Sequence, residues 1–247
     1  MAMEVQNNSA GRLFDILQSA LRSNQNDSLR KVWSRALGCD QSNNAELLRL
    51  WSELIQLTYK AKTEISDLEN IDEALYLKPF TSIEVLLGKV NFDHPWHQVS
   101  GHLDATTMQG LRFGADLLRR EHGNAIQIDD ERAESLIAEL DAVLKRVLAS
   151  DLPDKLKQLF VQNLEQLRRA LLGFRISGAE GIEQEIDRAL GSLLRHKQEV
   201  QDAAEGNDES AAVVKDYFGL VAKFNEAVTF GQNLMLLAAP LLSKLSS

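Results

Sequence analysis

The sequence predicts an all-α protein: a multi-helix bundle of about eight to ten helices with an up-down C-terminal half and no sheet. Three observations lead to this fold class. Apolar residues recur every three or four positions through almost the whole chain, which is the period of a helix. Leu and Ala are abundant while aromatic residues make up only 6% of the chain, a composition that favours helix over strand. No segment shows a convincing strand pattern.

Two helices are expected near the N-terminus, at 11–23 and at 29–37. Asp27 or Ser28 can cap the second of them, because a short polar side chain accepts a hydrogen bond from an unpaired amide of the first turn. Gly38 can end it, because glycine readily adopts the left-handed conformation that closes a helix. The two segments therefore read as short amphipathic helices joined by a polar turn.

Residues 45–70 carry the clearest pattern in the chain. Apolar positions recur at alternating spacings of four and three, the heptad pattern of a helix that lies along another helix; they are Leu47, Trp51, Leu54, Thr58, Ala61, Ile65 and Leu68. Leu50 and Leu57 widen this stripe, which favours packing in a bundle over an isolated coiled coil. Trp51 and Leu54 are candidate partner-binding residues unless the core takes up the whole face.

Pro79 is expected to end the helix before it, because proline lacks the amide hydrogen and restricts the preceding residue. Thr81 and Glu84 then have the spacing of a capping box that opens a short new helix. The stretch 91–103 is irregular.

Asp104 or Thr106 can cap the helix that follows this stretch. Gly110 and Gly114 lie four residues apart on it, and in a soluble protein such a pair usually lets two backbones approach closely. Gly123 is expected to end the helix.

The second half reads as helices with short connections, which favours an antiparallel up-down arrangement. Boundaries are expected at Pro153, at Gly178 and in the polar linker 204–209. We therefore expect three parts: an N-terminal helical part at 1–92 that contains the heptad-striped helix, a connecting loop plus helix at 93–128, and a C-terminal helical bundle at 129–247. The three parts can equally form one domain.

The charge balance argues against nucleic-acid binding. The chain has 27 basic and 36 acidic residues, a net charge of −9, whereas proteins that follow a phosphate backbone usually carry an excess of Lys and Arg on one face. An acidic surface could suit a basic partner, although it mainly favours solubility.

Cys39 is the only cysteine, so the chain cannot form an internal disulfide, as is usual in a reducing compartment. Residues 1–10 lack the order of basic and then apolar residues that marks a secretory signal. A cytoplasmic location is expected.

One cluster could bind a metal. Asp93, His94, His97 and His102 lie within ten residues, and imidazole and carboxylate groups are suitable ligands for zinc, nickel or iron. Pro95 and Gly101 interrupt the helix face that would have to bring the histidines together. A structural connection in which Trp96 fills the core is therefore the favoured interpretation of this segment.

The sequence contains none of the nucleotide-binding, hydrolase or di-iron signatures, and no residue stands out as catalytic or as a cofactor ligand. No cofactor is predicted.

The C-terminal run 227–243 contains no charged residue. Its seventeen residues are at the lower limit for a membrane-spanning helix, and Gly, Gln, Asn and Pro interrupt them. A buried closing helix is expected. Insertion into a partner's groove, with Leu236 as a contact, and a tail anchor remain as alternatives, and membrane association is disfavoured.

Two functions from different classes remain open. The favoured one is a non-catalytic helical interaction module, such as an adaptor, an immunity- or antitoxin-like neutraliser or an assembly subunit, which docks a protein partner through apolar helix faces. The alternative is a metal-binding enzyme or sensor that uses the histidine cluster. The sequence leaves homo-oligomerisation open.

Overall fold

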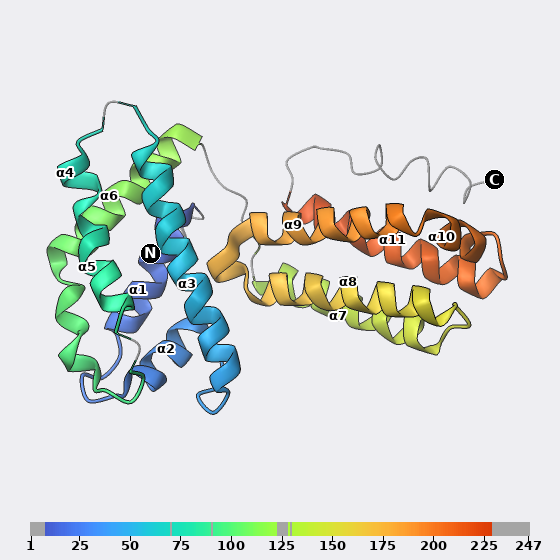
Figure 1. The fold of residues 1–247 in the computed structure, drawn as a ribbon, viewed down its shortest axis with the longest axis horizontal. Coiled ribbons are helices and arrows are strands. Elements are labelled where there is room, and N and C mark those ends of the chain that lie inside the picture. The colour runs from blue at the N-terminus through green and yellow to red at the C-terminus, as the bar shows by residue number, and fades with distance from the viewer. Residues whose placement is uncertain (1–7, 70, 90, 123–127, 129, 229–247) are drawn as a thin grey trace. The chain divides into compact units, whose positions relative to one another are not determined.

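The computed structural model describes residues 8–69, 71–89, 91–122, 128 and 130–228 (Figure 1). In these ranges the regular structure is helical, without strands, and the predicted all-α class is confirmed. None of their helices combines the length and the apolar character needed to cross a membrane. The chain divides into two compact units, which we call unit 1 (residues 1–125) and unit 2 (residues 126–247).

Unit 1 is built around helix α1, which contacts α2, α3 and α6. Most of its residues are buried, as expected for a helix with neighbours on several sides. Asn8 caps it by accepting a hydrogen bond from Gly11 N–H, and its amide also donates to the carbonyl of Ala115 on α6. The elements of this unit are α1 (Ser9–Leu21), α2 (Leu29–Leu37), α3 (Asn44–Ser66), α4 (Glu73–Tyr76), α5 (Lys78–Leu87), η1 (Trp96–Gln98), η2 (Ser100–His102) and α6 (Ala105–His122).

The helix ends of unit 1 follow the capping residues of the sequence in three places. The Ser28 side chain accepts a hydrogen bond from Lys31 N–H at the start of α2, and Gly38 ends α2 with φ 78°, in the left-handed region. Asp104 accepts a hydrogen bond from Thr107 N–H at 2.7 Å at the start of α6. These predictions are confirmed.

The predicted capping box at Thr81 and Glu84 is wrong. Helix α5 already begins at Lys78, so Thr81 lies inside it and Pro79 occupies the first turn. Proline is tolerated there because the amide that it lacks would have no partner inside the helix. The Glu84 carboxylate instead accepts a hydrogen bond from Lys62 Nζ of α3 at 2.7 Å, and so links α5 to α3.

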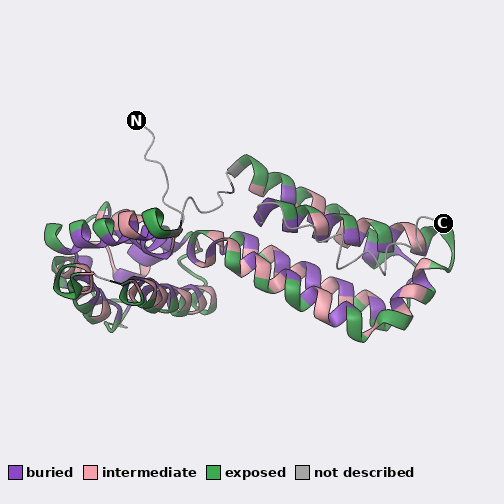
Figure 2. Cartoon of the chain, turned by 90° about the horizontal axis from the view of Figure 1, so that it is seen from above, coloured by how far each residue is buried: buried purple, intermediate pink, exposed green. Residues whose placement is uncertain are grey.

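Unit 2 is an antiparallel bundle in which α7 contacts α8 and α11, and α9 contacts the same two helices. Figure 2 shows buried residues along one side of these helices and exposed residues along the other. The predicted up-down arrangement of this half is confirmed. The elements are α7 (Asp130–Ala149), α8 (Asp154–Leu172), α9 (Phe174–Arg195), α10 (Lys197–Ala204) and α11 (Asp208–Val228).

The predicted boundaries in unit 2 agree with the structure at Pro153, at the linker and at Gly178, where φ 66° and ψ −165° break α9 into two helical segments at a kink. An additional break at Gly173, which separates α8 from α9, was not predicted. A further break at His196, which separates α9 from α10, was not predicted. No glycine or proline stands at this position to mark it.

A buried polar network joins three helices of unit 2. Asn163 on α8 donates from Nδ2 to Ser192 Oγ of α9 at 3.0 Å and to Tyr217 Oη of α11 at 2.9 Å. The Tyr217 ring also stacks on Phe160, with ring centroids 4.1 Å apart. Because every member of the network is buried and paired, the network can fix the register of α8, α9 and α11.

Candidate functional site

The segment that carries the histidine cluster is bonded to the start of α2. Leu29 N–H donates to the carbonyl of His94 at 2.8 Å, and Arg30 N–H donates to the carbonyl of Phe92 at 2.7 Å. Amides at the N-terminus of a helix have no partner within that helix. The backbone carbonyls of this segment therefore accept hydrogen bonds from the first amides of α2, which gives the segment a structural role.

The histidine side chains do not point to one centre. His94 Nε2 lies 3.0 Å from Asn91 Nδ2, and His97 Nδ1 lies 3.3 Å from the carbonyl oxygen of Gln25. His94 and His97 are exposed, and His102 is half-buried. The rings of His94 and His97 therefore each contact a different neighbour, Asn91 and Gln25.

Asp93 forms an ion pair with Arg30 at 3.3 Å. Among the described residues, no three His, Cys, Asp or Glu side chains are placed so that they could hold a metal ion together. The metal-binding alternative thus gains no support from the geometry and stays a prediction. Metal analysis of protein purified without a histidine tag, compared with a His97→Ala/His102→Ala variant, tests it.

The two candidate partner-binding residues of the heptad stripe lie in the core of unit 1. Trp51 and Leu54 are buried, and the Trp51 ring packs edge-on against Trp33 at 4.9 Å. Trp33 in turn packs edge-on against Trp96 at 5.8 Å. Leu236, the third candidate, lies outside the described residues, as does the C-terminal run from residue 229 onward.

A groove of about 510 Å³ lies between α4, α5 and α6, which stand side by side in unit 1 (Figure 1). Two large apolar side chains line it and remain exposed: Leu75 on α4, at 48%, and Phe113 on α6, at 43%. The volume is within the range typical of binding clefts. The lining residues are Ala74, Leu75, Lys78, Pro79, Ser82, Asp104, Thr106, Thr107, Gln109, Gly110 and Phe113.

A close approach of α5 to α6 shapes the groove. A Cβ atom at Gly110 would lie 2.5 Å from Cγ of Pro79, and one at Gly114 would lie 2.6 Å from Cδ1 of Ile65 on α3. The glycine pair thus lets two neighbours pack directly on α6, as the sequence predicted.

Replacing Gly110 by alanine is expected to lower the free energy of unfolding of unit 1 by about 1–3 kcal/mol, because the proline ring has to move. The matched control is Gly219→Ala, also within a helix but with open space at its Cβ position. It should be neutral or gain up to about 1 kcal/mol from helix propensity. Urea denaturation followed by circular dichroism measures both. Equal effects of the two substitutions would contradict the proposed packing.

The two charged side chains of the groove, Asp104 and Lys78, differ in their hydrogen bonding. The hydrogen bond from the Thr107 amide, and to a smaller extent the one from the Thr107 hydroxyl, holds the pKa of the Asp104 carboxyl below its ordinary value. Asp104 therefore stays ionised as the cap of α6. Lys78 forms no hydrogen bond or ion pair with the described residues. The lining therefore combines one anion, Asp104, and one cation, Lys78, with two exposed apolar side chains, Leu75 and Phe113.

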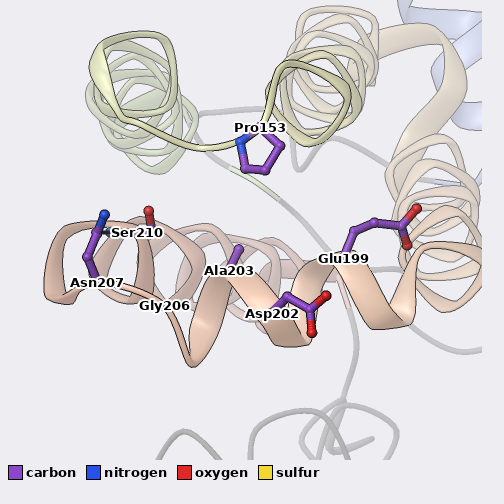
Figure 3. Close-up of a pocket in the computed structure, with 7 residues that line it drawn as sticks. All are labelled: Pro153, Glu199, Asp202, Ala203, Gly206, Asn207 and Ser210. Atoms are coloured by element: carbon purple, nitrogen blue, oxygen red, sulfur yellow. Dashed lines mark hydrogen bonds between the residues drawn. The ribbon is translucent and has the colours of Figure 1, made fainter.

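A second, smaller pocket of about 270 Å³ lies in unit 2, between Pro153 and the turn from α10 to α11 (Figure 3). Its two carboxylates are already engaged: Glu199 binds Lys155 Nζ at 2.9 Å, and Asp202 accepts a hydrogen bond from Gln198. The Lys155 ammonium lowers the pKa of Glu199 to about 2. We consider the groove of unit 1 the stronger candidate because it is larger and carries exposed Leu and Phe side chains.

Comparisons with protein-family models, curated proteins and solved structures give no match for this chain.

Proposed function

We propose that this protein is a non-catalytic helical interaction module that binds a protein partner through the groove between α4, α5 and α6. The class of function is the one favoured by the sequence, an adaptor, neutraliser or assembly subunit. The proposed contact residues are Leu75 and Phe113, which are exposed, in place of the sequence candidates Trp51 and Leu54, which are buried.

The observation that supports this proposal is the exposure of two large apolar side chains on a recessed surface. Covering a Leu or Phe side chain completely gains about 1.5–3 kcal/mol relative to leaving it in water. Apolar anchors that fill pockets supply much of the binding energy of protein interfaces. Leu75 and Phe113 can supply two such contacts without any rearrangement of the helices.

The chemistry of the lining favours binding over catalysis. Its polar side chains are hydroxyls, one amide, Lys78 and Asp104, and no lining residue is a histidine or cysteine. A nucleophile activated by an adjacent imidazole is therefore not available among these residues. Asp104 is already occupied as the helix cap.

Site-specific photocrosslinking in the native cell tests the proposal. A photoreactive phenylalanine analogue placed at Phe113 should crosslink a protein that also copurifies with the unmodified chain. The same analogue at Tyr59, which is 58% exposed on α3, is the control position and should not crosslink that protein.

Copurification should be lost in a Leu75→Asp/Phe113→Asp variant with an unchanged circular dichroism spectrum. A variant that retains the same partners as the unmodified chain would refute the groove as the docking site. The parallel variant Leu48→Asp/Tyr59→Asp, on α3, should retain them.

A further inference from the structure

An acidic segment runs directly into the groove. Residues 67–76 contain the four carboxylates Asp67, Glu69, Asp72 and Glu73, and no Lys or Arg. All four are exposed. Within the described part of the chain, none of them forms an ion pair. Since most other carboxylates of unit 1 helices have cationic neighbours, this segment, which we call the acidic strap (residues 67–73), is a local concentration of uncompensated negative charge.

The C-terminal end of the strap, at Asp72, is joined to a helix that lines the groove. The Asp72 carboxylate accepts a hydrogen bond from Leu75 N–H at 3.2 Å, so it caps α4. Ala74 and Leu75, which follow at once, line the groove. The lining itself carries one cation, Lys78, and one anion, Asp104, so its formal net charge is zero, and the carboxylates of Asp72 and Glu73, directly before Ala74, add negative charge at its α4 end.

We propose that the occupant of the groove is an amphipathic helix of a protein partner whose apolar anchors are flanked by lysine or arginine residues. This inference rests on the proposed function and specifies the chemistry of the partner. The apolar anchors would contact Leu75 and Phe113, and the flanking cations would lie over the strap.

Two physical arguments select this partner. A helix presents apolar side chains on one face and charged side chains at its margins, and it packs into a groove between helices. Complementary charge accelerates encounter and suppresses partners of the wrong sign. An acidic partner would instead be repelled both by the strap and by the net charge of −9.

The test uses the full-length chain and two synthetic helical peptides with the same leucine face, one flanked by lysines and one by glutamates. Binding is measured by fluorescence anisotropy at low and at high salt. The lysine-flanked peptide should bind at least about tenfold more tightly, and the difference should shrink with added salt because exposed charges are screened.

Three variants locate the interaction. Phe113→Ala should lower the affinity for the lysine-flanked peptide by about tenfold, since a central anchor is removed. Glu69→Gln/Glu73→Gln should lower the same affinity several-fold. The matched control Glu205→Gln/Glu209→Gln removes the same charge from unit 2, at the residue after α10 and in the first turn of α11, and should leave binding unchanged.

The outcomes separate this inference from the proposed function. Equal affinities for the two peptides, or equal effects of the two double variants, would overturn the charge preference. If both peptides bind with equal affinity and Phe113→Ala abolishes this binding, the groove is supported as a docking site without a charge preference. Binding that Phe113→Ala does not change, or absence of binding by the lysine-flanked peptide, would overturn the inference for this groove.

Discussion

Replacing Trp96 by alanine is expected to lower the free energy of unfolding of unit 1 by about 3–5 kcal/mol, the usual range for truncating a large buried aromatic side chain. Trp96 is fully buried and packs edge-on against Trp33 at 5.8 Å. It also lies in the segment whose carbonyls complete the start of α2. Since whole domains are stable by only about 5–15 kcal/mol, this loss removes a large share of the stability.

The tryptophans make this measurement specific to unit 1. All three, Trp33, Trp51 and Trp96, lie in that unit, so tryptophan fluorescence in a urea titration follows its unfolding while circular dichroism follows the helices of both units. The fluorescence midpoint should fall strongly in the Trp96→Ala variant.

His97→Ala is the matched control for this substitution, because it changes the neighbouring residue, whose exposed ring lies 3.3 Å from the carbonyl oxygen of Gln25. It should cost less than about 1 kcal/mol. An equally large effect of the histidine substitution would show that the imidazole, and not the indole, holds this segment.

Helix ends were predictable where a single residue type determines the local conformation. Ser28 and Asp104 cap helices through their own side-chain oxygens, and Gly38 adopts a left-handed conformation that other residues rarely adopt. Such effects are local and can be read along the chain. The capping box at Thr81 failed because the same residues are compatible with the interior of a helix once Pro79 occupies the first turn.

The groove could not be predicted, because it arises from packing between segments far apart in the sequence. Leu75 belongs to a four-residue helix without a recognisable period, and Phe113 belongs to an ordinary amphipathic helix. The packing of α4 and α5 on α6, with Pro79 against Gly110, brings the two to one groove. The spacing of Gly110 and Gly114 was the one signal of a close approach, and it did not reveal the neighbour.

The histidine cluster shows the converse problem. Residue types that bind metals were close in sequence, but their side chains diverge because the backbone between them bonds to the start of α2. Proximity along the chain gave no information on side-chain direction. Pro95 and Gly101, which interrupt a common helix face, were the observations in the sequence that weighed against convergence.

In unit 2, replacing Asn163 by alanine is expected to lower the free energy of unfolding by about 1–3 kcal/mol. The substitution leaves the Tyr217 hydroxyl without its amide partner, whereas the Ser192 hydroxyl keeps its hydrogen bond to the carbonyl of Ala189, and a buried group left without a partner costs about this much. Urea denaturation followed by circular dichroism measures the loss, and the fluorescence midpoint of unit 1 should not move. An unchanged circular dichroism transition would show that the network adds nothing to stability.

The pH dependence of the same network provides an independent check. Burial raises the pKa of the Tyr217 hydroxyl above its ordinary value of 10, outweighing the opposite effect of the Asn163 amide. A group whose pKa is raised by folding stabilises the folded state fully below its unfolded pKa and loses that contribution as the pH rises past it. Wild-type stability should therefore fall above pH about 10 through this residue. Tyr217→Phe should lower the free energy of unfolding by about 1 kcal/mol at pH 8, because Asn163 loses a hydrogen-bond acceptor. The free energy of unfolding of this variant should not show the fall above pH about 10 that Tyr217 causes. The two stability curves should converge above pH about 10, and parallel curves would contradict the buried, protonated state of Tyr217.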